Sequence, residues 1–198
     1  MKEQIIVAIG REFGSGGHYI AEKVAKDLGL GFYDRNMLDE IAREKGMKTE
    51  HLEKYDEKPR NRMLSRTVKG HTNSMEQILA DMQFDYIRKK ADTGESFVIV
   101  GRCADMVLKD REGLLSIFVL GDYDKKMERV IEKYQLTEAE AAAKIARHDR
   151  KRKQYHNRHS DTRWGHSESY DLCVNSSKLG LDKTAKILED YIKEWWEK

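Results

Sequence analysis

A glycine-rich stretch near the start of the chain has the composition of a loop that binds phosphate. It covers residues 10–18, reads GREFGSGGH, and directly follows an apolar run at residues 5–9. Glycines let the backbone curl so that several N–H groups point toward one centre, and a helix that begins there adds a partial positive charge. The expected ligand is the phosphate chain of a nucleotide, bound by Gly14, Ser15, Gly16, Gly17 and His18.

This loop lacks the lysine of the common phosphate-loop pattern, G-x-x-x-x-G-K-[ST]. When the pattern is aligned on Gly16, the lysine position holds Gly17 and the hydroxyl position holds His18. The hydroxyl that holds Mg²⁺ is also absent, unless Ser15 supplies it. Arg11 is the first candidate for the missing cation. A plain turn without a ligand stays open as an alternative, whereas the spacing of a dinucleotide fingerprint, G-x-G-x-x-G, does not occur.

Arginines in two later segments could bind phosphate groups, because a planar guanidinium forms two parallel hydrogen bonds to one phosphate. Arg102 follows the apolar run at residues 97–100, which would place it at the sheet edge where open α/β folds bind ligands. Arg147, Arg150 and Arg152 form the second group, in which Arg147 and Arg150 are the better pair to share one helix face. The alternatives are a surface ion pair for Arg102 and a solvated charged face for the second group.

Two aspartates, Asp34 and Asp105, also follow predicted strand ends. Either could bind the base or ribose of an acceptor or orient Mg²⁺ through water, and the alternative is a structural role at the start of a helix. His156, His159 and His166 raise the question of a metal site, but no carboxylate–cysteine pattern for zinc accompanies them. We therefore predict no metal site formed by protein ligands.

Short apolar runs and helical patterns alternate along the chain. The runs lack the alternation of a half-exposed sheet, which favours a parallel sheet covered on both faces, and they lie at residues 5–9, 30–33, 97–100, 114–120 and 170–174. A helix follows the glycine-rich loop and ends at Gly29. Later helices are expected at residues 75–91, 123–133, 137–150 and 181–196, with a capping box from Thr137 and Glu140. The alternation indicates βαβ units.

Two segments interrupt this alternation. About sixty residues separate the second predicted strand from the third, too many for one simple crossover, so residues 35–92 are interpreted as a helical insertion with a mobile, charged middle. Residues 148–167 are crowded with Arg, Lys and His, and we expect them to be irregular. The length of 198 residues fits one domain, residues 1–198, with one core.

Composition excludes several classes of protein. The 37 Lys and Arg residues are balanced by 35 Asp and Glu residues, a formal net charge of +2, which argues against a nucleic-acid-binding protein. Cys103 and Cys173 show no pairing or metal spacing, so both are expected to be buried thiols in a reducing compartment. The apolar runs are too short for a signal peptide or a membrane span, and the expected location is the cytoplasm.

Four segments together resemble the cytidylate-kinase-like family over nearly the whole chain. Residues 8–42, AIGREFGSGGHYIAEKVAKDLGLGFYDRNMLDEIA, are similar to the family's start, where R-[EQ]-[FY]-G-S-G-G typically replaces the lysine loop. Residues 98–105, VIVGRCAD, resemble the G-R-D segment of cytidylate kinases, and residues 147–152, RHDRKR, resemble their arginine-bearing lid. Residues 170–180, YDLCVNSSKLG, resemble their last strand and the loop after it.

This resemblance implies a P-loop kinase-type, three-layer α/β fold with a five-stranded parallel sheet, an acceptor-binding insertion at residues 35–92 and an arginine-rich lid at residues 148–167. The implied activity is ATP-dependent phosphoryl transfer, as in a nucleoside monophosphate (cytidylate-like) kinase that uses ATP and Mg²⁺. The implied catalytic cations are Arg11, Arg147, Arg150 and Arg152. The implied acceptor-binding residues are Asp34, Arg102 and Asp105.

Departures from the cytidylate kinase pattern leave the acceptor open. Residues 32–36 read FYDRN where cytidylate kinases usually have L-D-[TS]-G, and Cys103 replaces the aspartate of the G-R-D segment. The alternative function is a nucleotide-binding regulator or inactive kinase-like protein, because the lysine is absent. An RNA-binding module is disfavoured by the balanced charge. Small-molecule nucleotides are the expected partners, and an exposed tryptophan at Trp195 or Trp196 would mark a homodimer contact.

Overall fold

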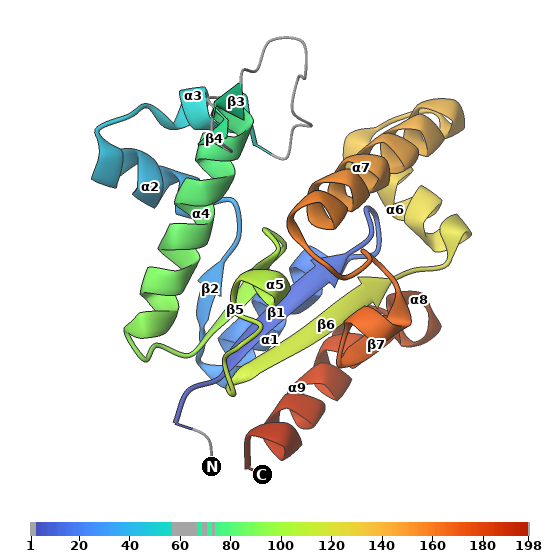
Figure 1. The fold of residues 1–198 in the computed structure, drawn as a ribbon. Coiled ribbons are helices and arrows are strands. Elements are labelled where there is room, and N and C mark those ends of the chain that lie inside the picture. Colours follow the sequence, from blue (N-terminus) through green and yellow to red (C-terminus); the bar gives the residue numbers. More distant parts are fainter. Residues whose placement is uncertain (1–2, 57–66, 69–70, 73, 198) are drawn as a thin grey trace.

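The core of the molecule is a parallel sheet that lies between two layers of helices (Figure 1). The computed structural model describes residues 3–56, 67–68, 71–72 and 74–197. Five strands follow the order β2-β5-β1-β6-β7, and every neighbouring pair is parallel, which confirms the predicted sheet. The strands are β1 (Ile6–Arg11), β2 (Gly31–Tyr33), β5 (Phe97–Val100), β6 (Leu114–Leu120) and β7 (Leu172–Asn175).

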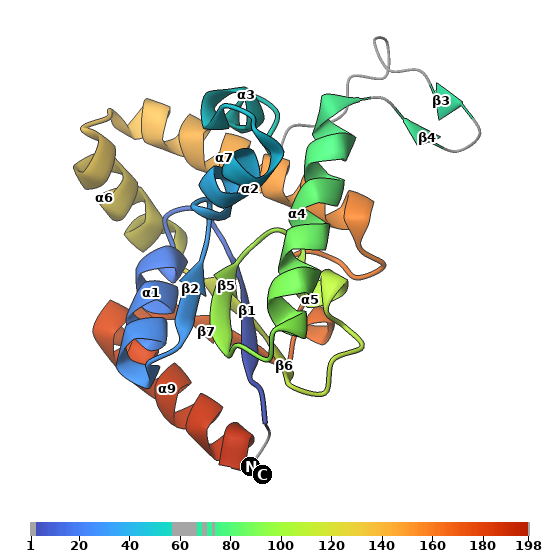
Figure 2. The ribbon, with the colours of Figure 1, turned by 90° about the vertical axis from the view of Figure 1, so that its left-hand side faces the viewer.

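Helices cover both faces of the sheet because successive strand residues point to opposite faces (Figure 2). Ile6 and Ala8 of β1 belong to the core on one face, whereas Val7 and Ile9 belong to the core on the other. The helices that cover the first face are α2 (Met37–Lys45), α4 (Met75–Asp92) and α5 (Ala104–Val107). The helices that cover the second face are α1 (Gly17–Leu28) and α9 (Leu181–Glu197). Because the strands are parallel, their carboxyl ends meet at one edge of the sheet.

The insertion between β2 and β5 is mostly helical but not entirely so. It contains α2, α3 (Thr49–Glu53) and α4, together with β3 (Thr67–Val68) and β4 (His71–Thr72), which pair antiparallel. The sequence did not predict these two-residue strands, because so short a pair has no periodic pattern to detect. Part of the predicted mobile middle, including Pro59, lies outside the described residues.

The segment at residues 148–167 was expected to be irregular, and for its first half this is wrong. Helix α7 (Glu138–His159) continues through it, after α6 (Tyr123–Tyr134) and the capping box that Thr137 forms with Glu140. The basic run stays helical because Lys, Arg and Gln have high helix propensity, and because Ala141, Ile145 and His156 bury one face. The chain leaves the helix at Ser160, and η1 (Ser167–Ser169) and α8 (Ser176–Leu179) follow.

The two cysteines and the terminal tryptophans differ in burial. Cys103 is buried, as predicted, but Cys173 is only partly buried. Trp195 and Trp196 are both partly buried against the core beneath α9, and a homodimer contact there stays a prediction. Within the part of the chain that the structure describes, no helix is both long and apolar enough to cross a membrane.

Candidate active site

The glycine-rich loop connects β1 to α1 in a conformation that glycine makes possible. Gly14 and Gly16 have positive φ angles of 81° and 77°, where a side chain would be strained, and a Cβ on Gly16 would also overlap Leu181. Ser15 is fully buried, and its hydroxyl donates to the carbonyl of Glu12 and accepts from the N–H of Gly17. The Ser15 hydroxyl is therefore used to hold the loop, and this placement does not present it to Mg²⁺.

Arg11 lies beside the position where other phosphate loops have lysine. A Cβ on Gly17 would lie 2.6 Å from the Cβ of Arg11, and a Cβ on Gly101 would overlap the Arg11 guanidinium. The side chain of Arg11 thus runs from the lysine position of the loop toward the end of β5. Gly17 and Gly101 leave the space that this side chain occupies.

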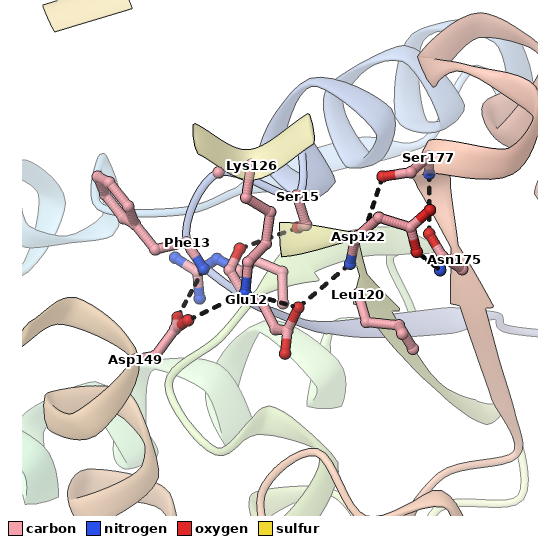
Figure 3. A network of polar contacts seen from close by, with 12 residues as sticks. Glu12, Phe13, Ser15, Leu120, Asp122, Lys126, Asp149, Asn175 and Ser177 are labelled. Atoms are coloured by element: carbon pink, nitrogen blue, oxygen red, sulfur yellow. Dashed lines mark hydrogen bonds and ion pairs between the residues drawn. The ribbon is translucent and has the colours of Figure 1, made fainter. Parts of the chain in front are cut away.

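A buried lysine forms ion pairs with both the phosphate loop and α7 (Figure 3). Lys126 of α6 is 6% exposed, and its Nζ lies 3.0 Å from Glu12 Oε2 and 3.5 Å from Asp149 Oδ2. The backbone N–H of Phe13 donates to Asp149 Oδ1 at 2.6 Å. Burial raises the pKa of the Asp149 carboxyl, and the hydrogen bond from Phe13 and the charge of Lys126 partly offset that rise. The network fixes the loop against the helix that carries the basic segment.

A cavity of about 30 Å³ lies at the carboxyl ends of β1 and β5. Three arginines line it: Arg11 at the end of β1, Arg102 after β5, and Arg152 on α7. It borders the start of the phosphate loop, where Arg152 Nη1 donates to the carbonyl of Arg11 at 3.2 Å. Open α/β sheets bind ligands where the strand order reverses, and here that point is β1, between β5 and β6.

Arg102 forms a buried ion pair with a carboxylate of the insertion. Its two terminal nitrogens bind the two oxygens of Asp56, with Nη2 to Oδ2 at 2.8 Å, and the two side chains are 2% and 3% exposed. Asp56 also lies 3.5 Å from Arg35 Nε and accepts from Gln83. Arg102 was expected to bind an acceptor phosphate or to form a surface pair, and the pair observed is buried. The chain's own carboxylate occupies the bidentate site of this guanidinium.

Asp34 and His18 contact each other at the start of α1, outside the cavity. His18 Nε2 lies 2.6 Å from Asp34 Oδ2, and the Asn36 N–H donates to Asp34 Oδ1. Burial raises the pKa of Asp34, but the hydrogen bonds from Asn36 and His18 outweigh it and hold that pKa below its usual value. Asp34 is therefore ionised at neutral pH beside the hydroxyl position of the loop.

The structure separates the arginines of the basic segment. Arg152 lines the cavity, whereas Arg147 and Arg150 are exposed on the other side of α7. The sequence favoured Arg147 with Arg150 because their spacing suits one helix face. With α7 continuous to His159, Arg152 shares a face with His156, four residues later, and that face borders the cavity.

A histidine on α7 makes the stability of this region depend on pH. His148 stacks on Phe13 at 4.3 Å, and burial, followed by the charge of Arg152, lowers its pKa from 6.5 to about 4. Between these values the unfolded chain binds a proton that the folded protein does not. The free energy of unfolding should therefore decrease as the pH falls from 6.5 to about 4. In urea denaturation over this range His148→Phe should lose less stability than the original protein, and equal losses in both would contradict this assignment.

A sequence profile of the cytidylate kinase-like family matches residues 6–178 of this chain. The chain belongs to the cytidylate kinase-like family. The matched range includes the phosphate loop without lysine, the turn after β5 and the whole of α7. The resemblance inferred from the sequence is thus confirmed at the level of the family.

Two relatives of this cytidylate kinase-like protein differ in how much of each chain they share. A cytidylate kinase of Pyrococcus horikoshii is 27% identical over 190 residues, which are 95% of this chain and 88% of that protein. A uronate isomerase of Corynebacterium glutamicum is 32% identical over 101 residues, but this chain covers 50% of its own length and only 19% of that protein. The similarity to the cytidylate kinase therefore extends over nearly the whole chain, whereas the similarity to the uronate isomerase covers only half of it.

Solved structures agree with the family. A crystal structure of an uncharacterized protein from Eubacterium ventriosum has a TM-score of 0.76 and 37% identity, over 96% of this chain and 99% of that one. Shikimate kinase from Bacteroides thetaiotaomicron has a TM-score of 0.57 at 12% identity, over 96% and 98%. The second likeness shows the fold alone, which is that of a P-loop kinase. Both the family and the fold of this chain are therefore kinase-like.

Several residues at the site of this cytidylate kinase-like chain were not found from the sequence. Lys126 and Asp149 lie in charged helical stretches, where nothing distinguishes them from solvated surface charges. Asp56 lies in the insertion, whose placement no local pattern determines. His156 was noted only as a possible metal ligand, and its partner, Asp105, precedes it by 51 residues. Such pairs are formed by tertiary contacts and have no signature of spacing.

Proposed function

We propose that the protein is an ATP-dependent phosphotransferase of the nucleoside monophosphate kinase type, acting on a small anionic acceptor. The observation that carries this proposal is the position of Arg11, whose side chain fills the space beside Gly17, where the loop lacks its lysine. The Cβ and Cγ of Arg11 lie beside Gly17, and its guanidinium reaches Gly101, just after β5, where a cation could stabilise the charge that develops on a transferring phosphoryl group. A nucleoside monophosphate such as cytidylate is the first candidate acceptor, because the family and the Pyrococcus horikoshii relative suggest it.

The roles in this proposal follow from the geometry of the loop and the cavity. The backbone of Gly14–Gly17, at the start of α1, would bind the phosphates of ATP. Arg11 and Arg152 would face the transferring group, and Arg102 would bind the anionic part of the acceptor in exchange for Asp56. Arg147 and Arg150 would reach the phosphates only after a movement of α7, so they have no role in this arrangement.

Magnesium fits the same end of the sheet. Asp34 offers an ionised carboxylate next to His18, and hard oxygen ligands of this kind suit Mg²⁺, which usually keeps several waters and binds one or two carboxylates together with nucleotide phosphates. When bound, the ion neutralises charge on the β- and γ-phosphates. The role proposed for Asp34 is to hold or orient it.

A nucleotide-binding regulator is the second candidate function, and two observations favour it. The Ser15 hydroxyl is used inside the loop, and the bidentate site of Arg102 is filled by Asp56. A regulator would bind ATP without consuming it.

ATP turnover with Mg²⁺ separates the two candidates. The protein should consume ATP faster when its acceptor is added from a panel of CMP, UMP, AMP, GMP, D-glycerate, glycerol 3-phosphate and ribose 5-phosphate. Arg152→Ala should lower the stimulated rate by about 10²-fold, as expected when one cation is lost from a transferring phosphoryl group. The control is Arg88→Ala, which removes an exposed arginine of α4. Binding of ATP by calorimetry with no turnover for any acceptor would favour the regulator.

A further inference from the structure

A histidine and an aspartate form a buried pair in the wall of the cavity. His156 of α7 is 6% exposed, and its Nε2 lies 2.9 Å from Oδ2 of Asp105, on α5. Both residues line the same cavity as Gly10 and Arg11, at the start of the phosphate loop. The pair therefore lies on the side of the loop where an acceptor would approach, and the function proposed above gives it no role.

The second nitrogen of the His156 ring has no hydrogen-bond partner among the described residues, although it is buried. An ionised carboxylate can only accept a hydrogen bond, so the proton of the neutral ring lies on Nε2, directed at Asp105. The lone pair then lies on Nδ1. Buried polar atoms in native proteins nearly always have partners, so a donor from a ligand or an ordered water is expected at this nitrogen.

Charged and polar groups from several elements surround the His156 ring. Arg11 from β1, Arg102 from the turn after β5 and Arg152 from α7 line the same cavity and oppose a further positive charge. Asp105 is the carboxylate that faces the ring, and two phenols, Tyr155 and Tyr170, complete the wall. Burial raises the pKa of Tyr170, so its phenol stays uncharged. In its neutral form, with the proton on Nε2, such a ring can accept a proton at Nδ1.

We propose that His156 is the general base of the transfer reaction and that the acceptor presents a hydroxyl group to its Nδ1. This rests on the phosphotransferase function proposed above. The hydroxyl proton moves to Nδ1 while the hydroxyl oxygen bonds to the γ-phosphorus of ATP. The bond from that phosphorus to the β–γ bridging oxygen breaks, and ADP leaves. Asp105 stabilises the imidazolium, which then releases its proton to water.

The same geometry defines the class of acceptor. A phosphate dianion, the attacking group of a nucleoside monophosphate, has no proton to give to Nδ1, whereas a hydroxyl has one. The three arginines of the cavity select a negative charge elsewhere on the molecule. Arg102 donates two hydrogen bonds to the carboxylate of Asp56, so this guanidinium is placed to bind a planar oxyanion. In place of the nucleoside monophosphate named above as first candidate, the inferred acceptor is a small hydroxyl compound that also carries a carboxylate or phosphate group.

His156→Gln tests the proposal through the rate and its dependence on pH. The substitution should lower ATP turnover by about 10²-fold or more, with the best acceptor of the panel and with water alone, since water is also a hydroxyl acceptor. The decline of the rate toward acid pH should disappear in this variant. In His156→Ala, added imidazole should restore part of the rate. The control is His166→Gln, because His166 is exposed and does not line the cavity.

Nitrogen NMR of the His156 ring gives a readout that does not depend on activity. At neutral pH, the ¹⁵N shifts should show a neutral ring protonated on Nε2, with the resonance assigned by its loss in His156→Gln. Asp105→Asn should change this tautomer and lower the rate, because an amide can donate to Nε2. A ring protonated on Nδ1 at neutral pH would overturn the proposal.

The outcomes separate this inference from the function on which it rests. If the original protein consumes ATP and His156→Gln does so equally fast, the base is refuted and the phosphotransferase stands. If CMP is the only acceptor that stimulates turnover, and His156→Gln is stimulated equally, the base is likewise refuted and the phosphotransferase stands. If the original protein consumes no ATP with any acceptor or with water, the phosphotransferase function and the base fail together.

Discussion

Replacing Arg11 by alanine should lower ATP turnover by about 10²-fold, because the loop then has no cation for the charge on the transferring phosphoryl group. The fold should survive, since Arg11 is the last residue of β1 and its neighbours in the sheet are unchanged. The measurement is the steady-state rate with Mg²⁺ and the best acceptor. Arg88→Ala is the matched control, as it removes an exposed arginine far along the chain from the loop.

A swap of two residues tests whether Arg11 stands in for the missing lysine. Gly17→Lys alone should destabilise the protein by about 1–3 kcal/mol, because the new Cβ would lie 2.6 Å from that of Arg11. Arg11→Gly combined with Gly17→Lys removes this overlap and returns a cation to the usual place. The double variant should be faster than Arg11→Ala. If it folds and binds ATP but is as slow as Arg11→Ala, the role assigned to Arg11 is wrong.

Replacing Arg102 by alanine should lower the free energy of unfolding by about 3–5 kcal/mol, because it leaves the buried carboxylate of Asp56 without its main partner. Arg35 cannot compensate, since its side chain is 63% exposed and its Nε lies 3.5 Å from Asp56. Urea denaturation followed by circular dichroism measures the change.

The double variant Arg102→Ala/Asp56→Ala is the control for this prediction. Removing the carboxylate as well removes the buried charge, so the double variant should be more stable than Arg102→Ala alone. The difference from additivity gives the coupling between the two side chains. A loss below about 1 kcal/mol in Arg102→Ala would mean that the pair is solvated, as in a surface ion pair.

Local patterns in the sequence were sufficient to predict the sheet and the phosphate loop. The runs at residues 97–100 and 114–120 are strands with the predicted bounds. Such short, continuous apolar runs are typical of strands in a parallel sheet that helices cover on both faces. The turn at Gly14–Gly17 is a loop before a helix because only glycine readily adopts its positive φ angles. The strands and the loop could be predicted because each depends on residues that are neighbours in the sequence.

Helix α7 marks the limit of that reasoning. The crowding of Arg, Lys and His in its basic half predicts an irregular segment, although Lys, Arg and Gln favour helix. The spacing of Arg147 and Arg150 makes them the better predicted pair, whereas the continuous helix brings Arg152, which was also predicted, and His156 to the cavity. The extent of a helix thus decides which of its side chains share a face at the site.

By itself, the sequence determined the family, the five strands of the parallel sheet with the longer helices between them, and the loop in which glycine replaces lysine. The tertiary structure decided which charges meet: Arg11 with Gly17 and Gly101, Arg102 with Asp56, and His156 with Asp105. The physical reason is the range of the interactions. Turns and the periodic pattern of buried residues depend on residues close together in the sequence. A buried ion pair depends instead on how segments far apart in the sequence pack, and the sequence pattern does not show which of them meet.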